Sequence, residues 1–291
     1  MVIKKKILFV LPSLEFGGAE KVMVVLYNHI NKEEFEPHFC VFKNGILFKK
    51  ISENNKITIL NKDRIMHGIT GLLKTIYKVN PDIVFSTHCH LNAIICLLKK
   101  IKLINSKVVI RESNFLSIQQ NSSKSFYKKN IVTWLIKKVY PVAENIICQT
   151  EEMKKDLQLF LSNSKINPVV IYNPIEDIPR YNKNLTVPRI ISIGRLEKQK
   201  NHPLIIEAFD LIKNSIPHHL VIIGGGSEHA SINKLIESKG LMNRVKLVGF
   251  VENVWDEYSG SSLFVLPSKY EGFPNVIIEA MANSIPVIST N

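Results

Sequence analysis

The sequence lacks a hydrophobic run that is long enough to span a membrane. Even the continuous apolar stretch from Ala93 to Leu98 falls far short of the roughly 18 residues that a spanning helix needs. Lysines before Ile7–Leu11 imitate the start of a signal peptide, but no small-residue cleavage site follows them. A first buried strand explains this segment better, and we expect a protein that does not cross a membrane.

Cysteine is scarce, and its pattern argues against two ways of stabilising a fold. The four cysteines lie inside apolar segments at irregular spacing, which indicates neither a disulfide framework nor a zinc site and fits a reducing cytoplasm. The run His88-Cys89-His90 is an alternative set of ligands, but neighbours on a strand point to opposite faces and no second pair completes a site. We therefore expect a cytoplasmic protein with no metal ion and no other cofactor.

Acidic residues are too few to balance the basic ones, which leaves a net charge of +13. The excess lies in residues 1–175, which carry 26 Lys and Arg residues against 13 Asp and Glu, whereas residues 176–291 carry 12 of each. This asymmetry favours an anionic partner such as nucleic acid, anionic lipid or another polyanion. Because the charge is spread over a whole domain and no nucleic-acid-binding motif is present, a nucleic-acid-binding protein is the weaker alternative, and we expect no nucleic-acid partner.

Low-complexity tracts and solenoid repeats are also absent, and short β-branched runs alternate with amphipathic stretches instead. This alternation predicts parallel sheets that are covered by helices on both faces. The predicted strands are 7–11, 38–42, 57–60, 83–86, 108–111, 146–149 and 169–172 in the first half, and 190–193, 220–223, 245–248, 263–266 and 287–289 in the second.

A proline-containing segment of little periodicity separates the two alternations. It predicts a Rossmann-like domain over residues 1–174, a linker over 175–188 and a second Rossmann-like domain over 189–291. We expect the two domains to face a central cleft at the carboxyl ends of their sheets, where open α/β folds bind ligands. Because the sequence stops directly after its last strand, we also expect the second domain to be incomplete and the chain to be truncated.

The stretch Glu271-Gly-Phe-Pro-Asn-Val-Ile-Ile-Glu279 predicts a loop followed by a helix start with proline near the first helical position. Free amides at such a helix start, together with a close backbone approach at glycine, form an anion site. The carboxylate of Glu279 can accept two hydrogen bonds, as a ribose diol requires. The alternative is that Glu271 caps the helix and Glu279 is solvated. The residues expected to bind substrate here are Gly272, Phe273, Pro274, Asn275 and Glu279.

A short basic loop after strand 190–193 contains Arg195 and Lys200. Arginine offers a planar fork and lysine a mobile point charge, so the two predict a clamp for a diphosphate, with a solvated surface loop as the alternative. The turn Gly224-Gly225-Gly226 lacks the full dinucleotide-binding spacing. The turn Gly17-Gly18-Ala19-Glu20 opens a helix with exposed amides, and a plain tight turn explains it about as well.

In order and spelling, these motifs resemble the retaining glycosyltransferases of family 4, which have the two-domain GT-B fold. The resemblance covers essentially the whole chain and rests on Gly17-Gly18-Ala19-Glu20, on Gly194-Arg195-Leu196 with Lys200-Asn201, and on the Glu-x7-Glu signature at Glu271 and Glu279. It implies that Arg195 and Lys200 hold the donor diphosphate, Glu279 the ribose, and that Glu271 lies beside the transferred sugar. The expected catalytic residues are accordingly Glu271, Arg195 and Lys200.

The resemblance also places the acceptor site in the first domain. It implies substrate contacts for Gly17, Gly18, His88 and Glu112. Many relatives carry a histidine at the position where this chain has Arg111-Glu112. The loop here instead resembles that of a subset of relatives with a Ser-Glu-Arg-Asn type of loop, so the role of any histidine stays open. Without an evident protein nucleophile, the leaving diphosphate would help to deprotonate the acceptor hydroxyl.

The expected function is the retaining transfer of a hexose or N-acetylhexosamine from a nucleotide sugar, with UDP favoured, to a glycan or lipid-linked acceptor in bacterial surface polysaccharide synthesis. Residues 125–140 mix aromatics with lysines, as helices at a membrane interface do. Such a helix would place the protein at the inner face of the cell membrane; the alternative is a helix whose apolar side packs on the sheet. Because this family usually continues for several more βα elements, a non-catalytic or fragmentary glycosyltransferase domain is the other alternative.

Overall fold

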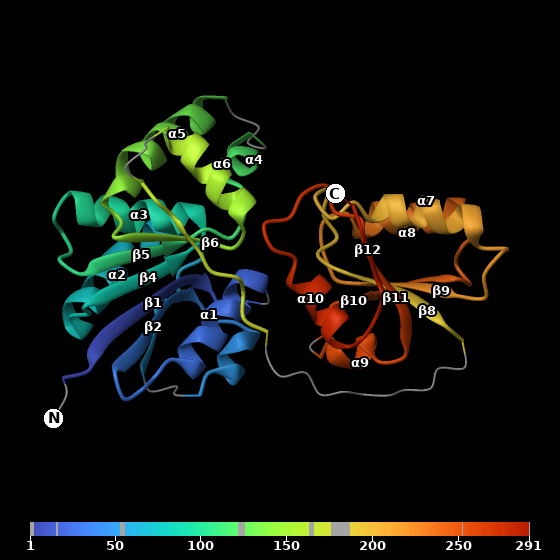
Figure 1. The fold of residues 1–291 in the computed structure, drawn as a ribbon, viewed down its shortest axis with the longest axis horizontal. Helices are drawn as coiled ribbons and strands as arrows, with labels where there is room; N and C mark the ends of the chain where they lie inside the picture. The colour runs from blue at the N-terminus through green and yellow to red at the C-terminus, as the bar shows by residue number, and fades with distance from the viewer. Residues whose placement is uncertain are drawn as a thin grey trace. The chain divides into compact units, whose positions relative to one another are not determined.

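The computed structural model describes residues 3–15, 17–52, 56–121, 126–162, 166–175, 187–251 and 253–290. The chain forms two compact units, Met1–Pro174 and Ile175–Asn291. Each unit is built on an open parallel sheet (Figure 1). Most of the predicted linker, residues 176–186, lies outside the described part of the chain.

Unit 1 has a seven-stranded sheet in the order β3-β2-β1-β4-β5-β6-β7, and all neighbouring strands run parallel. The strands are β1 (Lys5–Ser13), β2 (Phe35–Lys43), β3 (Ile57–Ile59), β4 (Ile83–Thr87), β5 (Lys107–Arg111), β6 (Asn145–Cys148) and β7 (Val169–Val170). The helices are α1 (Gly18–His29), α2 (Ile65–Val79), α3 (Cys89–Lys100), α4 (Leu116–Asn121), α5 (Phe126–Val139) and α6 (Glu151–Leu161), with the short 3-10 helices η1 (Ile46–Lys50) and η3 (Tyr140–Val142).

Alternate residues of the central strand β1 enter two different hydrophobic cores. Leu8 and Val10 pack in the core that also contains residues of α2, α3, α5 and α6. Phe9 and Leu11 point to the other face and pack with residues of α1. A strand that is apolar on both faces is typical of the centre of a parallel sheet, and Figure 1 shows α3 and α1 on opposite faces of it.

Unit 2 has a five-stranded sheet in the order β10-β9-β8-β11-β12, again parallel throughout. Its core lies between three strands and two helices and includes Leu220, Ile222 and Phe209. The strands are β8 (Arg189–Ile193), β9 (His219–Ile223), β10 (Val245–Gly249), β11 (Ser261–Leu266) and β12 (Val287–Ser289). The helices are α7 (His202–Ile212), α8 (His229–Ser238), α9 (Trp255–Tyr258) and α10 (Asn275–Ala282).

Each sheet has one point at which the order of its strands reverses. In unit 1 the chain first adds β2 and β3 on one side of β1 and then adds β4 on the other side. In unit 2 it adds β9 and β10 on one side of β8 and then β11 on the other. Helices leave such neighbouring strands toward opposite faces, so a crevice opens at the carboxyl ends of the strands, and ligands bind there in open α/β folds.

The predicted fold class, two Rossmann-like parallel-sheet units of the GT-B kind, is confirmed, and all twelve predicted strands are present. The predicted strand 83–86 does end before His88, but the assumption that His88, Cys89 and His90 are neighbours on a strand is wrong. Strand β4 ends at Thr87 because His88 has φ 75° and ψ 123°, which no extended strand can continue, and α3 begins at Cys89. Pro274 is the residue that precedes α10 rather than a residue of its first turn. The cleft between the units and the incompleteness of the second sheet stay predictions.

Candidate active site

The loops after β8 and β11 meet at the reversal point of unit 2. Lys200 follows β8, Glu271 follows β11, and Nζ of Lys200 lies 2.5 Å from Oε1 of Glu271. The two side chains are only 14% and 18% exposed, so the ion pair is largely shielded but can still be reached from solvent. Pairing of β8 with β11 thus brings together two of the three residues that the sequence predicts to be catalytic.

Hydrogen bonds between the two loops fix the backbone on both sides of this ion pair. The amide of Lys269 donates to the carbonyl oxygen of Gln199 over 2.8 Å. The side-chain Nε2 of Gln199 donates to the carbonyl oxygen of Tyr270 over 2.9 Å. Because Gln199 and Tyr270 directly precede Lys200 and Glu271, these bonds hold the two charged side chains in register.

Glycines allow the loop after β9 to pack directly behind the loop of Lys200. A Cβ atom on Gly224 would lie 2.0 Å from the carbonyl oxygen of Gly194, and one on Gly226 would lie 2.4 Å from that of Leu196. Both glycines have positive φ, 141° and 157°, which other residues rarely adopt. Gly194 in turn leaves room for the stem of Lys200, whose Cδ would be 3.2 Å from an added Cβ.

Glu279 lies on α10 with its side chain turned into unit 2. It is 8% exposed and therefore buried rather than solvated. The hydroxyl of Tyr258 lies 3.3 Å from Oε2 of Glu279 and 3.1 Å from the carbonyl oxygen of Val276. Burial, followed by the Glu279 charge, raises the pKa of Tyr258 well above its usual value, so Tyr258 remains a hydrogen-bond donor at neutral pH.

The remaining predicted residues of unit 2 surround the helix start. Gly272 is buried, Phe273 and Pro274 are half-buried, and Asn275 is the first residue of α10. Arg195 differs from Lys200, since its side chain is 65% exposed and its ion pair, with Glu197, is wider at 3.5 Å. Lys200 is therefore held in place before any ligand binds, whereas Arg195 extends into solvent.

Unit 1 has a second close pair of side chains, a carboxylate and an imidazole, at its own reversal point. Nε2 of His88, at the start of α3, lies 2.8 Å from Oε1 of Glu20 in the first turn of α1. Gly17 precedes α1 and Gly18 is its first residue. A Cβ atom on Gly17 would lie 2.0 Å from Oε2 of Glu20, so glycine at this position leaves the space that the carboxylate occupies.

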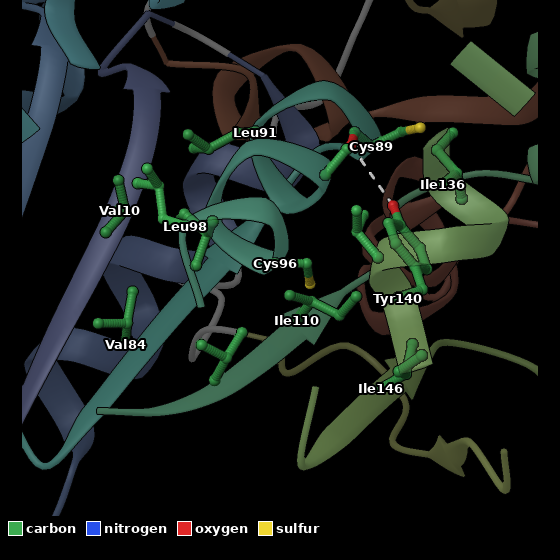
Figure 2. Close-up of a cluster of buried hydrophobic side chains, with 14 of the residues drawn as sticks. Val10, Val84, Cys89, Leu91, Cys96, Leu98, Ile110, Ile136, Tyr140 and Ile146 are labelled. Carbon is green, nitrogen blue, oxygen red and sulfur yellow. Dashed lines mark hydrogen bonds between the residues drawn. The ribbon is translucent and has the colours of Figure 1, made fainter. Parts of the chain in front are cut away.

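Glu112 is enclosed in unit 1 rather than exposed beside His88. It is 2% exposed, and its Oε1 accepts hydrogen bonds from the hydroxyl of Tyr140 (2.5 Å) and from Nδ2 of Asn92 (2.8 Å). Figure 2 shows Tyr140 directed toward the first residue of α3, Cys89, and the dashed line marks the 3.4 Å contact of its hydroxyl with the Cys89 carbonyl oxygen. Glu112, which directly follows β5, is thus bonded to α3 and to η3, and a direct substrate contact for it stays a prediction.

Arg111 precedes Glu112 and is also buried, at 3% exposure. Its Nη1 donates to Oγ1 of Thr87 over 3.3 Å, and its Nη2 lies 2.5 Å from Oδ1 of Asn173. Burial lowers the pKa of Arg111 to about 10 and raises the pKa of Glu112 to about 7, because both charged forms lose hydration. At neutral pH Arg111 is charged and Glu112 is divided between its two forms.

Sequence reasoning missed the residues that support the charged pairs. Gln199 lies inside a motif that the sequence singled out, but only the pairing of β8 with β11 places it against Tyr270. Nothing in the sequence marks Tyr258, which belongs to a different helix from Glu279. Within the described ranges, no group of three or more His, Cys, Asp or Glu side chains is arranged to hold a metal ion.

The chain is similar to known proteins over both units. The family described as "Glycosyl transferases group 1" matches residues 174–291. An uncharacterized glycosyltransferase of Methanocaldococcus jannaschii is 29% identical over 99% of this chain and 75% of the relative. The N-acetylgalactosamine-N,N'-diacetylbacillosaminyl-diphospho-undecaprenol 4-alpha-N-acetylgalactosaminyltransferase of Campylobacter jejuni is 28% identical over 96% of this chain and 79% of the relative.

A solved structure shares the fold. HepE of Anabaena, in complex with UDP and glucose, superposes with a TM-score of 0.78 at 18% identity over 98% of this chain and 80% of HepE. Fold and matches together define the class of protein: the chain is a glycosyltransferase with the GT-B fold. Membership of family 4 and truncation of the chain stay predictions.

Proposed function

We propose that the protein is a retaining transferase that moves a hexose or N-acetylhexosamine from a UDP-sugar to a glycan or lipid-linked acceptor in bacterial surface polysaccharide synthesis. The observation that carries the proposal is the shielded Lys200–Glu271 pair beside the start of α10, at the reversal point of a Rossmann-like sheet. An ammonium group, helix amides and the positive end of the helix dipole converge there, which suits a diphosphate.

In the proposed reaction the acceptor oxygen forms a bond to C1 of the donor sugar while the bond from C1 to the diphosphate oxygen breaks. UDP leaves with the electron pair, and the proton of the acceptor hydroxyl passes to a diphosphate oxygen on the same face. Lys200 and the amides at the start of α10 stabilise the charge that develops on the diphosphate, and the exposed Arg195 binds it from the solvent side.

The two glutamates have separate roles in this proposal. A bound diphosphate competes with Glu271 for the ammonium of Lys200, which frees the Glu271 carboxylate to accept hydrogen bonds from the sugar hydroxyls. Glu279, oriented by Tyr258 over 3.3 Å, accepts hydrogen bonds from the ribose diol. The names of similar proteins support the substrates, since HepE was solved with UDP and glucose and the Campylobacter relative acts on a diphospho-undecaprenol-linked sugar.

The diphosphate assignment is tested with Lys200→Ala and Arg195→Ala, with Lys198→Ala as the matched control, because Lys198 is an exposed lysine of the same loop. Losing a donor to the developing charge should lower kcat/KM for the nucleotide sugar roughly 100-fold in Lys200→Ala. Lys198→Ala should behave as the wild type. An unchanged kcat/KM in both Lys200→Ala and Arg195→Ala would refute the diphosphate site.

Glu271→Gln tests the sugar contact separately. This variant should bind UDP as the wild type does, measured by calorimetry, and lose transfer. The stereochemistry is read from the NMR coupling of the anomeric proton in the product, and an inverted anomer would contradict retention. A thermal-shift comparison of UDP-sugars with GDP-sugars identifies the donor, since a ligand at 100 times its Kd stabilises the folded state by about 2.7 kcal/mol.

We also propose that helix α5 holds the protein at the inner face of the cell membrane. Ile136 and Val139 pack in the core, whereas Ile131 and Trp134 are 64% and 61% exposed on the same helix. No helix in the described ranges has the length and apolar character needed to cross a membrane. The tryptophan fluorescence of Trp255→Phe, which reports Trp134 alone, should shift to the blue with anionic vesicles and stay unchanged with neutral ones; no shift with either would contradict membrane contact.

A further inference from the structure

The pair formed by Glu20 and His88 points to a role for Glu20 in the acceptor half of the reaction. We infer that Glu20 is a positioning residue that holds the His88 ring in one tautomer and one orientation, so that Nδ1 of His88 accepts a hydrogen bond from the incoming acceptor. The hydrogen in this bond is not the one that passes to the diphosphate: it comes from a neighbouring hydroxyl of the acceptor, or is the second hydrogen of a water molecule. The inference rests on the proposed function, because His88 can have this role only if a sugar is transferred to an acceptor. It concerns unit 1, and none of the donor-binding residues of unit 2 enters it.

The contact itself determines which ring nitrogen carries the hydrogen. An ionised carboxylate only accepts hydrogen bonds, so the 2.8 Å contact with Oε1 of Glu20 places the hydrogen on Nε2 of His88. In a neutral imidazole the other nitrogen, Nδ1, is then the acceptor. The His88 side chain is 31% exposed, against 13% for Glu20, so the ring is the member of the pair that a ligand can reach.

The backbone of His88 adds an independent observation. Its φ of 75° with ψ of 123° lies outside the regions that a residue with a side chain ordinarily adopts. Such a conformation is strained, and residues that keep it cluster at functional sites because the surrounding structure holds them there. Here it turns the chain sharply at the carboxyl end of β4, beside the reversal point of the sheet.

Charged groups from several elements hold the pair in place. The guanidinium of Arg111 attracts both Glu20 and Glu112, and its Nη1 donates to Oγ1 of Thr87, the residue before His88. The Glu20 carboxylate has room for this arrangement because Gly17 has no Cβ atom, which would lie 2.0 Å from Oε2.

Gly17 provides a test that leaves the chemistry of Glu20 unchanged. Its φ of −145° is one that alanine adopts freely, so Gly17→Ala should displace the flexible end of Glu20 without straining the backbone. We therefore expect Gly17→Ala and Glu20→Gln to have the same effect. The matched controls are Glu15→Gln, an exposed carboxylate paired with Lys43, and His90→Asn, an exposed histidine two residues after His88.

The first measurement is the 15N spectrum of the imidazole nitrogens, with the His88 signals assigned by their loss in His88→Asn. The wild type should show His88 with hydrogen on Nε2, and both Gly17→Ala and Glu20→Gln should shift it toward a mixture of tautomers. The second measurement is the hydrolysis of UDP-N-acetylglucosamine, or of the UDP-sugar that gives the largest thermal shift, in which water replaces the acceptor. Its kcat should fall about 10- to 100-fold in both variants and in His88→Asn, with the Kd for UDP unchanged.

Two results would overturn the inference. One is a His88 tautomer that is the same in wild type, Gly17→Ala and Glu20→Gln; the other is a shifted tautomer with kcat equal to that of the two control variants. A wild type that hydrolyses no nucleotide sugar would contradict the proposed function and the acceptor role of His88 together. In that case the NMR comparison still shows whether Glu20 orients the ring, so the two failures are distinguishable.

Discussion

Replacing Glu112 with glutamine should stabilise the protein at pH 8 and have little effect on its stability at pH 4.5 or below. Burial raises the pKa of Glu112 from 4.5 to about 7 in the folded protein, against the opposing effects of its hydrogen bonds from Tyr140 and Asn92 and of the charges of His88 and Arg111. The folded state therefore binds the proton more tightly than the unfolded chain does. The stability that this proton contributes is present below pH 4.5 and is lost as the pH rises through 7.

The magnitude follows from the two pKa values. A shift of one pKa unit corresponds to about 1.4 kcal/mol, so ionisation of Glu112 lowers the free energy of unfolding by about 3 kcal/mol in total. Most of that loss falls between pH 5 and pH 8. Glutamine has the shape of the protonated carboxyl and still accepts from Tyr140 and Asn92, so it should avoid the loss.

The assay is urea unfolding of wild type and Glu112→Gln at pH 5 and pH 8, followed by far-UV circular dichroism. Comparing the two proteins at one pH cancels the other titrating groups, including His202, whose pKa burial lowers to about 4 and whose contribution to stability therefore rises with pH instead. The difference between the proteins should grow by about 2–3 kcal/mol from pH 5 to pH 8. A difference that is the same at both pH values would refute the reasoning.

Two further predictions concern unit 2. Gly224→Ala should lower the free energy of unfolding by about 3 kcal/mol, because the new Cβ would meet the carbonyl oxygen of Gly194 and the φ of this residue is 141°. Gly225→Ala is the control: no atom lies within 4 Å of its new Cβ, so the free energy of unfolding should change by about 0.5 kcal/mol or less. Equal effects of the two substitutions in urea unfolding would contradict the close packing at Gly224. Tyr258→Phe should weaken UDP binding by about 1 kcal/mol, or about fivefold in calorimetry, because Glu279 loses the donor that orients it, and an unchanged Kd would argue against Glu279 as a ribose contact.

The sequence was sufficient to predict the strands because each is a short β-branched run bounded by turn residues. The period-two burial of Leu8 and Phe9 on opposite faces follows directly from that pattern. The sequence was insufficient at His88, because nothing in it marks the sharp turn that the backbone makes after the predicted strand 83–86. That turn depends on contacts with Glu20 and with the segment around Arg111, which lie 68 and 23 residues away in the chain, and local propensity contains no information about them.

The proximity of Lys200 to Glu271 could be predicted from the sequence, whereas the contacts that their neighbours make could not. Lys200 and Glu271 stand in motifs that end strands, so their meeting follows once β8 and β11 are adjacent. The burial of Glu279 against Tyr258 could not be predicted. Helix α10 has only eight residues of mixed polarity, and its sequence does not indicate whether Glu279 lies on the buried or the exposed face. Specificity for a donor depends on neighbours of this kind, which is why the motifs alone predict a diphosphate sugar but no particular base.

Both units have a shielded pair of polar side chains at the reversal point of their sheets. Each pair joins a carboxylate to a nitrogen group: Glu271 to the ammonium of Lys200 in unit 2, and Glu20 to the imidazole of His88 in unit 1. None of the four side chains is more than 31% exposed. A charge held in such a shielded crevice without a partner would cost free energy and would shift or move the group. The pairing keeps both groups oriented. In the proposed reaction a diphosphate replaces Glu271 at Lys200, whereas the acceptor binds Nδ1 of His88 while Glu20 stays at Nε2. A variant that removes one member of either pair should therefore disturb the orientation of the other before it disturbs the fold.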